Sequence, residues 1–309
     1  MSQPSNIARS LLFVALTAGA VALAIADLLI GTTSVSIGQV WSVLCGATED
    51  ASLETIVLRM RLPKVLVALF AGLALSASGL QMQTLFRNPL AGPYVLGVNS
   101  GASLGVALFT LATPMMGLAS ASWLHSFGVT GVAWIGSAAI LLLVMSLSRR
   151  VRNINTILII GMMLSSAISA LVGILQYMGT EESLKAFVVW TMGSVSTVTI
   201  DELWVLIPVV VVGLVLAIVV IKPLNMLLLG ESYARTMGLN VARSRAIIFI
   251  STTLLAGTVT AFCGPIGFIG LAMPHLARIT FRTADHRVLM PAAMLWGAVS
   301  MLFCTVACD

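Results

Sequence analysis

Long apolar runs separated by short charged connections constrain this chain more than any other feature of its sequence. Only 9% of its 309 residues are charged and 59% are hydrophobic, and the mean hydropathy is +1.07. Soluble domains carry about 25% charged residues. A helix needs about 20 apolar residues to cross roughly 30 Å of hydrocarbon. The sequence therefore predicts an all-α, polytopic transmembrane bundle with no soluble domain of its own.

The apolar runs predict nine membrane spans in a single transmembrane domain over residues 1–309. A short ninth run, at 267–281, contains Pro274 and crosses only if it is tilted or packed inside protein. The others lie near 11–30, 62–85, 92–112, 128–147, 154–178, 202–221, 244–265 and 288–308.

Basic residues gather at alternate ends of these runs, which predicts the orientation in the membrane. With the N-terminus in the cytoplasm, most Lys and Arg face inward, and the opposite threading inverts this positive-inside bias. The inward set is Arg9, Arg87, Arg149, Arg150, Arg152, Lys222, Arg235, Arg243, Arg245, Arg278, Arg282 and Arg287. The outward set is Arg59, Arg61, Lys64 and Lys185, and the threading leaves Asp309 outside.

Several other interpretations of the composition are set aside. The net charge of +5 follows from basic residues on the cytoplasmic side rather than from binding nucleic acid. The beginning of the chain resembles a signal peptide, but its apolar run continues through Ile30, so an uncleaved first span fits better. The cysteines lack CxxC spacing and the three histidines are scattered, so we expect no metal and no cofactor on this chain.

The outward cluster Arg59, Arg61 and Lys64 runs against the positive-inside tendency. One interpretation is interfacial anchoring by snorkelling side chains. The other is a docking patch for an acidic partner outside the membrane, where such charges guide encounter and register. The residues alone leave both open.

The segment 88–93 cannot be regular helix, because two prolines and a glycine interrupt it. Broken backbone at membrane depth is tolerated only inside protein or along a water-filled cavity. Polar residues surround this segment: Gln81, Gln83, Asn88, Asn99 and Ser100. We therefore expect it near a pathway or at the cytoplasmic mouth of one.

Two short helices are expected in the loops. Between Lys222 and Arg245, residues 231–237 form a helix that Gly238 closes, with Glu231 and Arg235 paired four residues apart. The apolar side chains of this loop lie either on the bilayer surface or in a groove on a soluble partner. On the outside, residues 181–190 form a helix that caps a cavity or lies in the interfacial belt.

Two absences from the sequence also discriminate between transport mechanisms. No GxxxxGK[ST] phosphate loop occurs, so the chain does not hydrolyse nucleotide itself. Ionisable residues within the spans are nearly lacking, Asp27 being close to an end, whereas proton- or sodium-coupled carriers use such residues as relays.

Motifs along most of the chain resemble the permease subunit of the ABC importers for ferric siderophores, haem and cobalamin. The likeness runs from about residue 31 to the last residue. The stretches that carry it are 61–64, 78–83, 88–91, 96–102, 229–231, 234–235, 238, 267–271, 274–275 and 285–287.

The resemblance implies a ten-span protein of the bacterial inner membrane that dimerises, as a homodimer or heterodimer, around a central pathway. A soluble binding protein would deliver the chelate outside and dock on Arg59, Arg61 and Lys64. Two ATPase subunits, which bind ATP and Mg²⁺, would dock inside on residues 224–239. The implied coupling residues are Leu229, Gly230, Glu231, Ala234, Arg235 and Gly238, and Asn153, Asn155 and Thr156 would fall near the cytoplasmic gate. With the polar residues around the broken segment, Gln83, Asn88, Asn99 and Ser100, they make up the predicted pathway or gate residues.

The resemblance implies a tenth span beyond Asp309, so we expect this sequence to lack the last span of the fold. We expect import of an iron chelate by alternating access, with ferric siderophore as the default and cobalamin or haem as alternatives. The rival functions are a secondary transporter that needs no ATPase and a membrane scaffold that does not transport.

Overall fold

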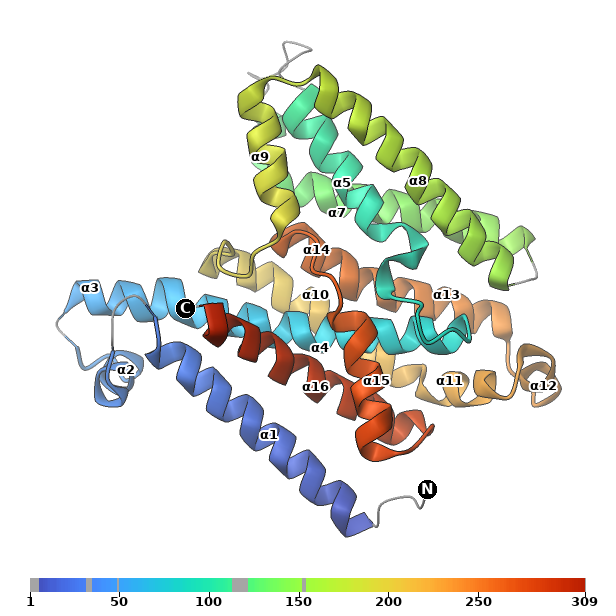
Figure 1. Cartoon of the computed structure of the whole chain (residues 1–309), viewed down its shortest axis with the longest axis horizontal. Coiled ribbons are helices and arrows are strands. Elements are labelled where there is room, and N and C mark those ends of the chain that lie inside the picture. Colours follow the sequence, from blue (N-terminus) through green and yellow to red (C-terminus); the bar gives the residue numbers. More distant parts are fainter. Residues whose placement is uncertain (1–5, 32–34, 49, 113–121, 152–153, 309) are drawn as a thin grey trace.

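The computed structural model describes residues 6–31, 35–48, 50–112, 122–151 and 154–308, and every secondary-structure element among them is a helix (Figure 1). The predicted all-α fold is therefore confirmed. Seven helical stretches are long and apolar enough to cross a membrane: Asn6–Leu29, Ala51–Leu85, Gly128–Ser148, Ile154–Met178, Ile200–Val219, Val241–Cys263 and His286–Cys308. A shorter apolar stretch covers Val98–Ala112.

The first half of the chain contains the central helix of the bundle. Its elements are α1 (Asn6–Leu29), α2 (Ile37–Leu44), α3 (Ala51–Glu54), the π-helix η1 (Thr55–Arg61), α4 (Leu62–Leu85), the 3-10 helix η2 (Pro93–Leu96), α5 (Val98–Ala107), the π-helix η3 (Leu108–Ala112) and α7 (Ser122–Arg150).

The second half supplies the helices that surround α4 and the connection at one end. Its elements are α8 (Ile154–Met178), α9 (Glu181–Met192), α10 (Ile200–Val219), α11 (Ile221–Leu228), α12 (Glu231–Thr236), α13 (Val241–Thr252), the π-helix η4 (Thr253–Gly257), α14 (Thr258–Cys263), α15 (Ile269–Phe281) and α16 (His286–Cys308).

Helix α4 lies at the centre of the bundle, between α10, α13, α15 and α16 (Figure 1). Most of its residues are buried on all sides. Glycines allow the neighbouring backbones to approach, since a Cβ on Gly72 would overlap the backbone of Gly297 and one on Gly79 would overlap that of Gly270. These contacts are the close packing through small residues that drives helix association in lipid.

A second group of helices, α5, α7, α8 and α9, packs beside this centre (Figure 1). Gly101 of α5 and Gly136 of α7 face each other, so the two helices meet backbone to backbone. The expected span at 92–112 is shorter than predicted because Gly97 adopts a positive φ of 79° between η2 and α5. The short helices expected in the loops are present as α9 and α12.

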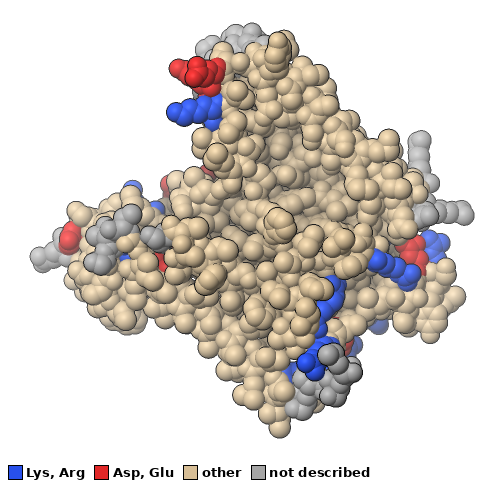
Figure 2. Space-filling model, viewed as in Figure 1, with Lys and Arg blue, Asp and Glu red and all other residues tan. Residues whose placement is uncertain are grey.

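Charged side chains cluster toward two opposite ends of the molecule and leave a broad uncharged band between them (Figure 2). In that view Lys and Arg gather toward the end where α11 and α12 lie. The sequence predicts that the connections at this end face the cytoplasm, and we call it the inner end after that prediction. The opposite end, which we call the outer end, carries α2 and α3 at the left of Figure 1, and α9 begins at the top of the view.

Candidate functional site

Arg61, from the predicted docking cluster, holds the end of α1 in place. Its Nη1 donates hydrogen bonds to the carbonyl oxygens of Leu28 at 2.8 Å and Leu29 at 3.0 Å. The last carbonyls of a helix have no partner within it, and they carry the negative end of the helix dipole. A guanidinium therefore caps this end well, and Arg61 is buried as a result.

Lys64 forms an ion pair with Asp27 across the contact between α1 and α4. The distance from Nζ to Oδ1 is 3.1 Å, and the hydroxyl of Thr305 in α16 donates to Oδ2 at 2.9 Å. Asp27 is only 1% exposed. This buried carboxylate thus joins α1, α4 and α16. The sequence analysis did not predict that Asp27 connects helices, although a single acidic residue in an apolar run was a signal for it.

Arg59 differs from its two neighbours because its side chain is exposed. It lies on η1, the π-helical turn that leads into α4. Within this cluster, Arg59 is the residue that the fold leaves on the surface of the outer end.

Gln83 bridges α4 and α15 from a buried position. Its Nε2 donates to the carbonyl of Leu271 at 2.9 Å, and its Oε1 accepts a hydrogen bond from Nη1 of Arg278. Sequence reasoning did not select Arg278 as a site residue. The feature that could have identified Arg278 is its position as a basic residue within the short, proline-containing apolar run.

Asn88 fixes the turn that follows α4. Its Oδ1 accepts the backbone N–H of Leu90 at 2.9 Å and its carbonyl accepts that of Ala91 at 3.1 Å. Local bonds of this kind favour a turn over helix. Pro89 and Leu90, which the turn carries, are exposed at the inner end.

The other predicted pathway residues lie apart from this turn. Asn99 and Ser100 are half-buried at the start of α5, whereas Asn155 and Thr156 are exposed at the start of α8. Asn153 lies outside the described residues. The described hydrogen bonds of Gln83 and Asn88 go to α15 and to the local turn rather than to Asn99 or Ser100.

A basic pocket of about 660 Å³ opens beside Gln83 at the inner end. We define it by its lining residues, which are Gln83, Thr84, Arg87, Asn88, Pro89, Leu228, Leu229, His275 and Arg278. The pocket therefore brings together the predicted pathway residues Gln83 and Asn88 and the predicted coupling residue Leu229. It also contains three basic side chains, Arg87, His275 and Arg278, which the sequence analysis did not group.

The predicted coupling segment is two short helices, α11 and α12, that are fastened to the bundle. Nη2 of Arg87, which follows α4, donates to the carbonyl of Leu227 at 3.2 Å, near the end of α11. At the start of α12, Glu231 pairs with Arg245 of α13, whose Nε lies 3.1 Å from Oε1. The sequence had favoured Arg235 as the partner, but tertiary packing supplies Arg245 instead.

Gly238 closes α12 as predicted. It has a φ of +84°, its N–H donates to the carbonyl of Arg235 at 3.0 Å, and the N–H of Leu239 reaches back to Ala234 at 3.0 Å. This pair of bonds is a Schellman motif. Ala234 is buried, whereas Leu229 and Tyr233 are exposed on the surface of the segment.

His286 connects α11 to α4 and α16 at the inner end. Its Nε2 lies 2.7 Å from the Thr84 hydroxyl and its Nδ1 lies 2.7 Å from Oδ1 of Asn225. Asn225 in turn donates to Asp285 at 2.6 Å. The backbone N–H of Arg287, which also donates to the Asp285 carboxylate, lowers the pKa of that carboxyl.

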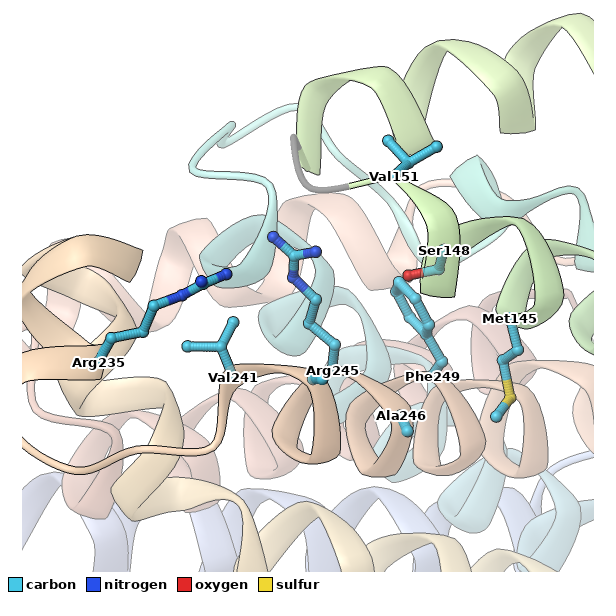
Figure 3. A pocket seen from close by; sticks show the side chains of 9 residues that line it. Met145, Ser148, Val151, Arg235, Val241, Arg245, Ala246 and Phe249 are labelled. Carbon is cyan, nitrogen blue, oxygen red and sulfur yellow. The ribbon is translucent and has the colours of Figure 1, made fainter.

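A second pocket, of about 350 Å³, lies between the coupling segment and the end of α7. Figure 3 shows Arg235 and Arg245 extending into it from α12 and α13, with Ser148 and Val151 on the opposite wall. Motion of α12 would therefore change the width of this pocket and the packing of α12 on α13.

Comparison with known proteins identifies relatives along nearly the whole chain. The model of the FecCD transport family matches residues 15–309. The hemin transport system permease protein HmuU of Yersinia pestis is 37% identical over 91% of this chain and 82% of its own length. The vitamin B12 import system permease protein BtuC of Salmonella typhi is 36% identical over 88% of this chain and 81% of its own length.

Two further similarities concern iron transport and structure. The Fe(3+) dicitrate transport system permease protein FecC of Escherichia coli is 36% identical over 82% of this chain and 74% of its own length. A solved inward-facing conformation of a metal-chelate type ABC transporter matches with a TM-score of 0.81 at 32% identity. That match covers 96% of this chain and 89% of the solved one.

Proposed function

Because this chain belongs to the FecCD transport family, in which its relatives are permease subunits of ABC importers, we propose that it moves a ferric siderophore inward by alternating access. The coarser function is that of an inner-membrane, multi-pass importer permease for a metal chelate, haem, vitamin B12 or ferric citrate. It is not an enzyme, because ATP is hydrolysed by a separate subunit of such importers.

The attachment of the coupling segment carries this proposal. Arg87 links α11 to the end of the central helix, and Glu231 links α12 to α13. The exposed side chains of Leu229 and Tyr233 lie on the same segment. A soluble ATPase that pushes on this surface would therefore act directly on α4 and α13, two helices of the bundle.

In the proposed cycle, two ATPase subunits close on ATP and Mg²⁺ and shift α11 and α12. The bundle, paired with a second permease subunit in the lipid bilayer, then exchanges outward- and inward-facing states. Gln83, Asn88, Asn99, Ser100, Asn153, Asn155 and Thr156 would line or gate the route. A soluble substrate-binding protein would dock at the outer end, where Arg59 supplies the exposed charge and Arg61 and Lys64 hold the surface beneath it.

The test is ATP-driven uptake into proteoliposomes that contain the permease, its ATPase subunits and its binding protein. Glu231→Gln leaves the Arg245 guanidinium, whose side chain is 7% exposed, without its carboxylate. A charged hydrogen bond contributes about 1.5–3 kcal/mol to stability, so the attachment of α12 to α13 weakens about tenfold or more and ATP-driven uptake should fall. Glu182→Gln, on the exposed outer helix α9, is the matched control and should transport normally.

Uptake that is independent of ATP, together with a Glu231→Gln variant that transports at the normal rate, would support the secondary transporter and contradict this proposal. The chelate is tested separately by mass spectrometry of the ligand that the binding protein carries from cells. We expect the binding protein to carry a ferric siderophore. If it carries haem, cobalamin or ferric citrate instead, the substrate is the one named for HmuU, BtuC or FecC, respectively.

A further inference from the structure

The basic pocket at the inner end has charge that the described part of the chain does not neutralise. Arg87, His275 and Arg278 line it, and no carboxylate does so among the described residues. The described ion pairs join Lys64 to Asp27 and Arg245 to Glu231. Arg278 is half-buried, whereas Arg87 and His275 are exposed at the opening of the pocket. A half-buried guanidinium without a counter-ion favours an anion beside it, and the two exposed basic groups strengthen that preference.

The two guanidiniums are held in place with donors to spare. Nη2 of Arg87 is directed at the carbonyl of Leu227, and Nη1 of Arg278 at the amide oxygen of Gln83. Each guanidinium has five N–H donors in a rigid fork, which matches carboxylate and phosphate oxygens. Gln83 itself is fixed by its bond to Leu271. Gln83 and Arg278 are therefore held in place between α4 and α15, and the exposed Arg87 is oriented by its bond to Leu227.

The position of His275 adds a third donor on the same wall. It lies three residues before Arg278 on α15, so both side chains lie on one face of that helix. Pro89, Leu228 and Leu229 also line the pocket and are exposed, so apolar and basic side chains lie side by side at its opening. This combination fits a ligand that has an anionic head and an apolar tail.

We propose that the basic pocket binds a phosphate-type oxyanion, supplied by the headgroup of an anionic phospholipid or by free phosphate. The bound anion would bridge Arg87, beside the end of α11, to Arg278 on α15. It would thereby link the coupling segment to a helix that packs on the central helix α4. This proposal does not depend on which chelate is carried.

The experiment measures binding to the full chain in a neutral detergent, with two probes. Native mass spectrometry follows saturable binding of phosphatidylglycerol, with phosphatidylcholine as the reference lipid. Thermal unfolding follows stabilisation by inorganic phosphate against an equal ionic strength of chloride. Saturable phosphatidylglycerol binding identifies the lipid source, whereas a phosphate effect alone identifies the free anion, and either result supports the site.

The variants locate the binding. Arg278→Gln should weaken it about tenfold or more, since one charged hydrogen-bonding group is lost. Arg282→Gln removes the same charge four residues further on, at an exposed position outside the pocket, and should bind as the unmodified chain does. If Arg278→Gln does not fold, His275→Gln changes an exposed side chain instead and should weaken binding severalfold. The proposal is overturned if neither probe binds, or if the pocket variants bind as tightly as Arg282→Gln.

Discussion

The carboxylate of Asp27 and the ammonium of Lys64 lie 3.1 Å apart, between the first helix and the central helix of the bundle. The pair is nearly enclosed, with the two side chains 0% and 13% exposed. Lys64 therefore has a structural partner within its own chain, and its contribution to any outer docking surface is indirect.

Asp27→Ala should destabilise the protein strongly, because it leaves Lys64 without its carboxylate. Removing one partner of a buried pair costs about 3–5 kcal/mol. The measurement is thermal unfolding in detergent, and Asp27→Ala combined with Lys64→Met should recover much of the loss. An unaltered unfolding temperature in Asp27→Ala would show that the pair contributes nothing.

Substitutions at Arg59 and Arg61 should have different effects, one on docking of the binding protein and the other on the stability of the permease. Arg59→Ala is expected to slow association with the binding protein, with stronger effects at low salt, and to leave unfolding unchanged. Arg61→Ala should lower stability by about 1.5–3 kcal/mol, since it removes charged hydrogen bonds to the end of α1. The measurements are binding kinetics and thermal unfolding, and the assignment is wrong if the two variants behave alike.

Gly79→Ala should disrupt the contact between α4 and α15. The added Cβ would overlap the carbonyl oxygen of Gly270, which is backbone and cannot rotate away. Overpacking of this kind costs about 1–3 kcal/mol or more. Gly173→Ala on α8 is the control, because its Cβ meets no atom within 4 Å. Yield of folded protein and unfolding temperature provide the comparison, and equal behaviour of the two variants would contradict the close approach.

Asp285 should make the attachment of α11 sensitive to acid. Its pKa is lowered in the folded protein, so its stabilising contribution is present above the ordinary value of 3.8 and is lost as pH falls through the folded pKa. Unfolding temperatures of the unmodified chain and Asp285→Asn, measured from about pH 6 downward, should therefore begin to converge below about pH 3.8. A constant difference across that range would show that this carboxylate is not responsible.

Much of the local structure was predictable because it depends on short-range chemistry. Gly238 predicted the end of α12, since a left-handed residue there suits glycine. Likewise, the prolines and glycine of 88–93 predicted the break after α4, which Asn88 then shapes. Side-chain pairs between different helices could not be predicted in this way. Glu231 has Arg235 within reach along its own helix, yet its carboxylate pairs with Arg245.

The apolar runs and the basic residues at their alternate ends determined by themselves that this chain is a helical membrane protein, because these signals depend on composition and spacing along the chain. The ordered motifs added the resemblance to an importer permease. Only the tertiary structure decided that Arg61 caps α1, that Asp27 meets Lys64, and that Arg87 and Arg278 share a pocket. The physical reason is that each relationship joins residues from different helices. Which helices become neighbours depends on close packing at glycines such as Gly72 and Gly79.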